Sequence, residues 1–306
     1  MLSYVLRRAL QGVLVLAVLS ALIFVLMRLM PGDPAAYMAG SGATEEEIER
    51  IRDVLGLNEP LVVQYLGWLG RVATNTEISI YSRRLVSTEI TERIAFTFPL
   101  ATLAMAFALT IGIPLGCLAA VRRGSFVSRG LTALSTLTMS TPAYLVGLML
   151  ISGFAVRWRL FPVGGTGTLG HWVLPVVSLT LTRVGTIIRT TTASVMDSLD
   201  ADYTRTAMGK GLSQSAMLVH HVLKNSLIPI AAIVGVELGA LLAGTAITEV
   251  IFTWPGLGRL MVEAIHSRDF PLIQSLVLFF GALFVVLNVA VDLIYLALDP
   301  RIRYTA

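Results

Sequence analysis

Six long apolar runs constrain this chain more than any other feature of its sequence. They cover approximately residues 10–30, 99–121, 131–156, 172–192, 226–252 and 273–298. An α-helix needs ~20 mostly apolar residues to cross a hydrocarbon core ~30 Å thick, and each run meets that length. Since 55% of the residues are apolar and 14% are charged, the apolar surface exceeds what one soluble core can bury. The sequence therefore predicts an all-α polytopic membrane protein with six transmembrane helices.

The third run contains the dipeptide Thr141-Pro142. Proline removes one backbone donor and clashes with the preceding helical turn, so we expect this span to bend or to split in two. The first run follows two arginines and could instead be a cleaved signal peptide. Its length exceeds the usual 7–15-residue signal core, and the residues after it give no convincing cleavage site, so an uncleaved helix is favoured.

Positive charges in the short connections predict the orientation, because cytoplasmic loops carry an excess of Lys and Arg. Four segments fall on the same side of the membrane under a six-span topology, and they carry Arg7, Arg8, Arg122, Arg123, Arg129, Arg205, Lys210, Lys224, Arg301 and Arg303. Both termini are then expected in the cytoplasm. The predicted organisation is a tip and first span (1–30), an extracytoplasmic helical insertion (31–96), a core of five spans (97–298) and a cytoplasmic tail (299–306).

Part of the insertion is expected to fold into helices. Thr44 followed by Glu47 is a capping box, and Gly56 is a natural C-terminal stop. These signals predict an amphipathic helix over 45–55 and a second helix over 60–72. Their expected apolar faces comprise Ile48, Ile51, Val54, Leu55, Val63, Leu66, Trp68 and Leu69. The insertion is interpreted either as a docking surface for a soluble partner or as a lid that stabilises the outer mouth.

A polar and basic segment, residues 200–225, interrupts the apolar pattern between the fourth and fifth runs. Asp202 suits a helix N-terminus, Gly209 and Gly211 break that helix, and Ser213 can begin another. The segment thus predicts a compact knob at the membrane surface that could insert into a cleft on a partner. An amphipathic connector lying on anionic lipid is the alternative.

Two glycine pairs, Gly112 with Gly116 and Gly235 with Gly239, each place small residues on one helical face. This spacing lets helices approach closely, and ordinary packing is favoured over gating.

Catalysis and metal binding have no support in the sequence. The Gly209-Lys210 pair is followed by Gly211 and lacks the hydroxyl residue of a phosphate-binding loop, so this chain is not expected to hydrolyse ATP. The four histidines show no spacing typical of a metal site, and no metal or other cofactor is predicted for this chain.

Several separated motifs carry a family resemblance. They include the runs 30–34 (MPGDP), 55–60 (LGLNEP), 268–271 (RDFP) and 299–303 (DPRIR). The run 248–259 contains Trp254, Pro255, Gly256 and Arg259, and the knob segment contains Tyr203, Arg205, Thr206, Ala207, Lys210, Gly211, Leu212, His221, Leu223, Asn225 and Pro229. Together these resemble the first permease subunit of dipeptide/oligopeptide/nickel ABC importers, including the "EAA" loop that contacts the ATPase.

The resemblance implies a type I importer permease in a bacterial inner membrane. Its expected partners are a second, related permease, two cytoplasmic ATPases that bind ATP and Mg²⁺, and a periplasmic or lipid-anchored solute-binding protein. It also implies that the knob segment couples to an ATPase and that the run 248–259 forms a periplasmic or gate motif. Short peptides are the commonest cargo of the family, with nickel complexes and glutathione as neighbours.

The chain departs from the family pattern at three places: residues 75–79, Thr192 and Met208. A fourth departure is Glu237, in the middle of the fifth run. An ionisable group there is expensive, so it is expected to face a cavity or a partner. One hypothesis is that Glu237 lines the translocation pathway and favours cationic or amino-bearing solutes; the other is a buried, hydrogen-bonded carboxyl. An unchanged ratio of basic to neutral transport in Glu237→Gln would contradict the first.

A function of another class is an ion-gradient-driven transporter or channel that needs no ATPase. It predicts intramembrane relays or broken helices in two corresponding halves of the chain. Glu237, Arg183 and Arg189 are too unevenly placed to favour it, and it leaves the knob without a purpose.

Overall fold

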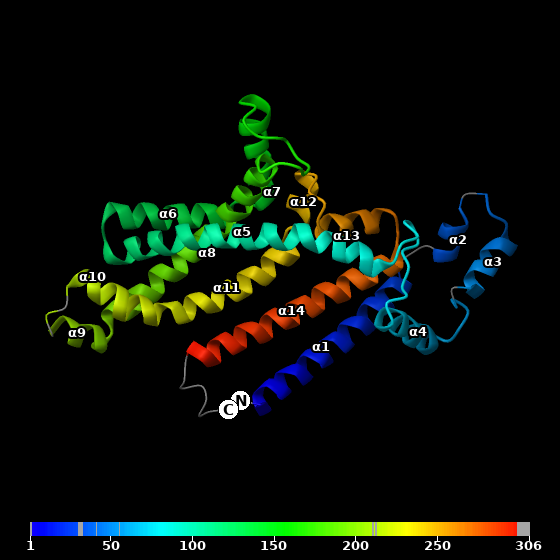
Figure 1. Ribbon diagram of the computed structural model, residues 1–306, viewed down its shortest axis with the longest axis horizontal. Helices are drawn as coiled ribbons and strands as arrows, with labels where there is room; N and C mark the ends of the chain where they lie inside the picture. Colours follow the sequence, from blue (N-terminus) through cyan, green and yellow to red (C-terminus); the bar gives the residue numbers. More distant parts are fainter. Residues whose placement is uncertain are drawn as a thin grey trace.

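Long helices make up most of the chain in the computed structural model, which describes residues 2–29, 33–40, 42–54, 56–209, 211 and 213–298. Four are long and apolar enough to cross a membrane: α1 (Leu2–Leu29), α5 (Val86–Val121), α8 (Gly170–Asp200) and α14 (Phe270–Leu298) (Figure 1). Two bent helix pairs raise the number of spans to as many as six. The prediction of an all-α membrane protein is confirmed, and the six predicted spans correspond to these four helices and the two bent pairs.

The third span breaks at Thr141-Pro142, as the sequence predicts. Helix α6 (Phe126–Ser140) ends just before it, and Pro142 is the N-cap of α7 (Ala143–Leu150), which continues into the π-helical segment η1 (Ile151–Arg157). The two halves meet at 97°. Figure 1 shows α7 leaving the plane of the other helices.

Several helices extend beyond the apolar runs that predicted them. Helix α5 begins 13 residues before the expected start at residue 99, and α8 continues to Asp200. Hydropathy marks only the part of a helix that needs an apolar environment, whereas packing against other elements supports the rest. At the start of α5, Val86 and Ile90 are buried against Leu257 and Leu260 of α13 (Leu257–His266).

The fifth apolar run is divided. The π-helical segment η2 (Leu218–Leu223) leads into α11 (Lys224–Gly244), and the chain bends by 45° before Pro229. A separate short helix, α12 (Ala246–Ile251), follows α11.

The helices predicted in the insertion are present, after a short α2 (Pro34–Ala39). Helix α3 (Glu45–Val54) begins with the capping box: the Thr44 N–H donates to Glu47 Oε2 at 2.8 Å, and the Glu47 N–H donates to Thr44 Oγ1 at 3.4 Å. Gly56 follows with φ +65°, the left-handed conformation that glycine adopts freely. Helix α4 (Leu61–Ala73) matches the second prediction within one residue at each end.

The predicted apolar faces of these two helices are partly wrong. No described residue of α3 is buried, and Val63 and Leu66 of α4 are more than half exposed. Trp68 is buried and Leu69 partly buried, as predicted, and they pack around Phe24 near the end of α1 together with partly buried Tyr65 and Val72. Contact with α1, rather than the apolar content of α4 alone, selects the buried face.

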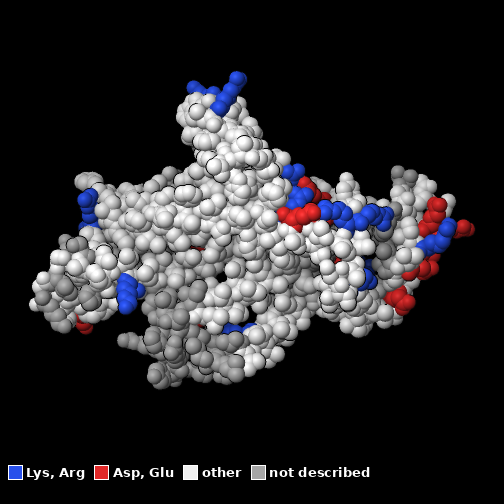
Figure 2. Space-filling model, in the orientation of Figure 1, with Lys and Arg blue, Asp and Glu red and all other residues white. Residues whose placement is uncertain are grey.

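The main core lies where α5, α8 and α11 meet. Leu100, Ala104, Leu179 and Leu241 are buried there with Trp254. Figure 2 shows charged side chains at both ends of the molecule, at the tip of η1 and in a mixed cluster over α13 and the start of α5. The surface between this cluster and the end that carries α9 and α10 shows few charges, as a protein surrounded by lipid requires.

Candidate functional site

The knob segment has the helix–turn–helix form that the sequence predicts. Helix α9 (Asp202–Gly209) is followed by Gly211 with φ +80° and then by α10 (Gln214–Met217), which continues through η2 into α11. Ser213 Oγ accepts a hydrogen bond from the Ala216 N–H at 3.4 Å and begins the second helix. Lys210 and Leu212 lie outside the described residues, as does the side chain of His221.

The inner face of the knob is packed against the membrane helices. Ala207, Met217 and Val222 form a buried cluster with Ala120 of α5 and Val195 of α8. Thr204 is fully buried and donates from Oγ1 to the Ser198 carbonyl at 2.6 Å. Ala207 is therefore not available to a partner, because its side chain is 5% exposed and faces the chain's own core.

The outer face of the knob is formed by α9. Tyr203, Arg205, Thr206 and Met208 are exposed, and Arg205 pairs with Asp202 at 3.7 Å. Asn225, at the start of α11, is also exposed. The sequence thus identifies the segment, and the structure divides its residues between an anchoring face and an exposed face.

The knob and the helical insertion lie at opposite ends of the molecule, with α9 and α10 at one end and α2, α3 and α4 at the other (Figure 1). Arg123, in the turn between α5 and α6, pairs with Asp200 at 3.2 Å just before α9.

The run 248–259, expected to form a periplasmic or gate motif, has its Trp254 inside the protein. Trp254 is fully buried, and its indole N–H donates to the Phe96 carbonyl at 3.2 Å. Its ring meets Phe96 and Trp172 edge to face, with centroids 6.2 Å and 4.5 Å away. Pro255 is half-buried. This geometry gives Trp254 a packing role between α5 and α8.

Glu249 organises the rest of that motif. Its fully buried carboxylate accepts hydrogen bonds from Thr97 Oγ1 at 2.7 Å, from Thr245 Oγ1 at 3.1 Å and from the Arg259 N–H at 2.9 Å. Gly256 lies directly against it, because a Cβ there would fall 2.3 Å from the carboxyl carbon. The carboxylate also lies at the N-terminus of α13, where the helix dipole favours negative charge.

Glu237 has a partner that the sequence did not reveal. Its carboxylate forms an ion pair with Arg183 of α8, and the two side chains are 13% and 25% exposed. The ion pair balances the charge of Glu237 within the chain. It is compatible both with a role in the translocation pathway and with a buried, hydrogen-bonded carboxyl. Arg183 Nε has no hydrogen-bond partner among the described residues.

A buried anchor, Asp269, was missed as a site residue. Its carboxylate accepts hydrogen bonds from Ser79 Oγ, and from the N–H groups of Ile80, Tyr81 and Leu272 at 3.2 Å each. Asp269 therefore begins α14 and also holds the loop that follows α4, including part of the divergent stretch 75–79. The Asp-Phe-Pro run is a sequence signal for a helix N-terminus, but nothing local indicates the loop contact.

Two family models match the chain. The model described as "Binding-protein-dependent transport system inner membrane component" matches residues 112–304, and its N-terminal companion matches residues 1–101.

Known proteins match it over nearly its full length. The chain is 41% identical to "Probable peptide ABC transporter permease protein y4tP" of Sinorhizobium fredii, covering 98% of this chain and 99% of that protein. It is 37% identical to "Glutathione transport system permease protein GsiC" of Escherichia coli K12, covering 99% and 100%. A solved structure of the MetNI methionine ABC transporter, in an inward-facing conformation, aligns with TM-score 0.59 at 17% identity over 69% of this chain and 96% of that one. At that identity the alignment shows a shared fold.

Proposed function

This chain belongs to the permeases of binding-protein-dependent ABC importers, in the family of peptide transporters, and we propose that it forms half of a translocation pathway for short peptides or a related small solute. The names of its relatives support that cargo class, since they are described as peptide and glutathione permeases. The other half is a second, related permease.

Energy comes from two cytoplasmic ATPases that bind ATP and Mg²⁺, and a periplasmic or lipid-anchored binding protein delivers the solute. The permease itself is non-catalytic and lies in the bacterial inner membrane with both termini in the cytoplasm. The family assignment supports these partners in general terms.

One observation carries the coupling proposal: α9 exposes Tyr203, Arg205 and Thr206 while its opposite face is fixed to the membrane helices. A partner that grips the exposed face would act on an element that is anchored by buried Ala207 and Thr204. Displacement of α9 is then transmitted to α8 and α5 as rigid-body motion, because packed cores move as units.

Glu237 is placed in the translocation pathway by this proposal, together with Arg183. The support is their incomplete burial, since an ion pair in a span is expensive unless it faces a cavity or a partner.

The test is co-purification of the full complex from native membranes. In the wild-type chain we expect a second permease and the ATPases to co-purify. Tyr203→Ala and Arg205→Glu should each reduce the recovered ATPase and lower solute-stimulated ATP hydrolysis, because they alter the exposed face of α9 and leave its anchored face intact. Arg50→Glu, an exposed charge reversal on α3 at the other end, is the matched control.

Full ATPase recovery and stimulation in both α9 variants would show that α9 is not the contact. Recovery of the wild-type chain alone, still transporting in vesicles without ATP, would overturn the importer mechanism and favour the ion-gradient alternative. Gly211 is less suitable for this test, because its positive φ would strain any other residue and confound coupling with folding.

A further inference from the structure

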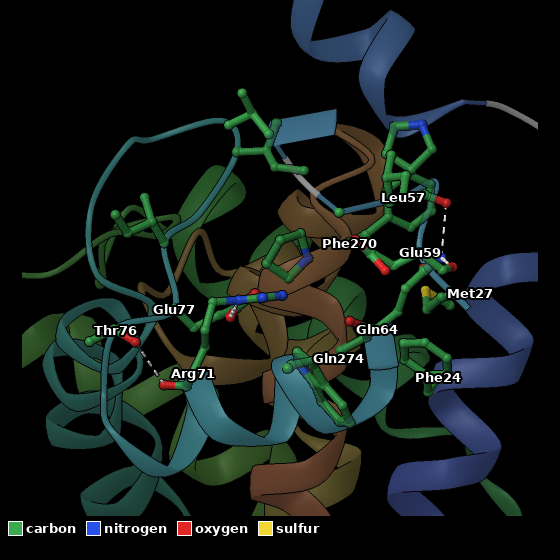
Figure 3. A pocket seen from close by; sticks show the side chains of 18 of the residues that line it. Phe24, Met27, Leu57, Glu59, Gln64, Arg71, Thr76, Glu77, Phe270 and Gln274 are labelled. Atoms are coloured by element: carbon green, nitrogen blue, oxygen red, sulfur yellow. Dashed lines mark hydrogen bonds and ion pairs between the residues drawn. The ribbon is translucent and has the colours of Figure 1, made fainter. Parts of the chain in front are cut away.

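A cavity of about 500 Å³ opens on the insertion side of the molecule, at the end opposite the knob. Its walls come from the end of α1, from α4, from the loop after α4 and from the start of α14. In the view of Figure 3, Arg71 and Glu77 lie on one side, Phe24 and Met27 on the other, and Gln64 between them. The volume falls within the range of ~300–1,000 Å³ typical of small-molecule sites.

The charges around this cavity are unbalanced. Its described lining includes Arg28, Arg71 and Arg83 but only two carboxylates, Glu59 and Glu77. Arg71 pairs with Glu77 at 2.7 Å, and Arg28 and Arg71 repel each other electrostatically. Burial raises the pKa of the Glu77 carboxyl, with the Arg71 hydrogen bond opposing it, so this wall of the cavity is poorly solvated. A cavity of this kind attracts an anion.

Two buried polar atoms beside the cavity lack partners. Gln64 Oε1 and Trp68 Nε1 have no hydrogen-bond partner among the described residues, and both side chains line the cavity from successive turns of α4. Trp68 is 2% exposed. An unsatisfied buried donor or acceptor costs ~1–3 kcal/mol, so such atoms usually have a partner that binds there. Here one atom accepts and the other donates.

The apolar part of the lining adds a last requirement for a ligand, an apolar group. Phe24 and Trp68 are buried and stacked with ring centroids 6.2 Å apart, and Met27 packs against them. A fitting ligand therefore needs an anionic group, an N–H donor, a carbonyl acceptor and an apolar side chain within a few bonds. The C-terminal residue of a peptide, or an N-acyl amino acid, carries all four.

We propose that this cavity is a solute site of the permease that binds the carboxyl-terminal residue of a short peptide. Arg71, with Arg28 at the rim, contacts the carboxylate. The peptide N–H donates to Gln64 Oε1, a carbonyl accepts from Trp68 Nε1, and the apolar side chain rests on Phe24 and Met27. This inference rests on the proposed function for the peptide class of the ligand. It requires neither the ATPases nor the coupling by α9.

The experiment is equilibrium binding of N-acetyl-L-leucine to the purified full-length chain in nanodiscs. N-acetyl-L-leucinamide, which lacks the carboxylate, is the comparison probe. We expect the carboxylate probe to bind at least tenfold more tightly. Arg71→Gln combined with Glu77→Gln should remove that preference, and the double change avoids leaving Glu77 as a lone buried charge.

Trp68→Phe tests the indole N–H, which has no hydrogen-bond partner among the described residues. Because the buried ring also loses volume, the unfolding temperature should fall, so binding is measured at a temperature at which the variant stays folded. N-acetyl-L-leucine binding should weaken about three- to tenfold, as expected for one hydrogen bond. Trp158→Phe, an exposed tryptophan after η1, is the matched control and should change neither quantity.

Two outcomes would overturn the proposal. One is equal binding, or no binding, of the acid and the amide. The other is competition by lipid: N-acetyl-L-leucine binds in nanodiscs of phosphatidylcholine, but adding phosphatidylglycerol abolishes that binding. This result would assign the cavity to an anionic lipid headgroup. If N-acetyl-L-leucine does not bind, the proposal that α9 couples to the ATPases is unaffected, because co-purification with the ATPases tests it separately.

Discussion

The pair formed by Arg183 and Glu237 shows how one contact changes the interpretation of a residue. The sequence presents Glu237 as a lone carboxylate in an apolar run, and its partner is 54 residues away in another helix. Removing one member of a buried pair leaves an uncompensated charge, and here Arg183 Nε already lacks a partner among the described residues.

We expect Glu237→Gln and Arg183→Gln each to destabilise the chain by roughly 3 kcal/mol, toward the low end for a buried pair because both side chains are partly exposed. The double variant should recover most of that loss, since no unpaired charge remains. Thermal unfolding of the purified variants in one detergent measures the coupling energy. Additive losses in the double variant would show that the pair contributes no interaction.

The same set of single and double variants also improves the transport test of Glu237. In Glu237→Gln alone, a lower ratio of basic to neutral transport could reflect the orphaned arginine. The ratio is therefore to be compared between the wild-type chain and the double variant, in which stability is expected to be similar.

At the scale of elements, the two glycine pairs differ in what they contact. A Cβ at Gly112 would fall 2.7 Å from Ile187, and a Cβ at Gly116 would fall 2.5 Å from Thr191, so both glycines let α5 approach α8 closely. Gly235 is closer still, since a Cβ there would fall 1.8 Å from Val291 of α14, but the nearest described atom to a Cβ at Gly239 is 3.6 Å away, on Phe284.

Gly112→Ala and Gly116→Ala should each destabilise the chain by about 1–3 kcal/mol, because the added methyl group overpacks the α5–α8 contact. Gly239→Ala is the control: it occupies the second position of the other pair, has room for a methyl group and gains helix propensity. Unfolding temperatures would be compared across the three variants. A loss in Gly239→Ala as large as the other two would contradict the packing explanation.

The elements that could be predicted from sequence are those specified by neighbouring residues. The capping box joins positions three apart, and Pro142 acts on its own turn, so both are correctly predicted. The ends of α5 and α8, the burial of Trp254 and the Asp269 anchor depend on contacts between distant segments, such as Ser79 with Asp269 across 190 residues. No local pattern encodes those pairings. The knob lies between these cases. Its helices are specified by neighbouring residues, but the side on which Ala207 is buried depends on contacts with α5 and α8.

At the scale of the whole molecule, the knob and the insertion are separated along its length (Figure 1). Few charged side chains show on the surface between the knob and the charged cluster over α13 (Figure 2). This separation agrees with a knob and an insertion on opposite sides of the membrane, and the cytoplasmic side of the knob remains a prediction from the arginines in alternate connections.

Cysteine labelling tests that orientation. In a background where the single cysteine is replaced, Cys117→Ala, we expect Arg50→Cys of α3 to react with a membrane-impermeant maleimide in intact spheroplasts. Arg122→Cys, exposed after α5, should react only after lysis, because the orientation predicts that it lies on the cytoplasmic side. Labelling of Arg122→Cys in intact spheroplasts, with Arg50→Cys protected, would invert the topology.

The Asp269 anchor has a consequence for how this region can evolve. Donors from Ser79, Ile80 and Tyr81 reach one carboxylate that also begins α14. An insertion or deletion of a single residue among these three would misalign several donors at once, whereas a substitution at Ile80 or Tyr81 keeps the backbone N–H that makes the contact. We therefore expect selection to act on the length of this loop more strongly than on its side chains. Across homologous chains, a fixed spacing should then indicate the anchor better than residue identity.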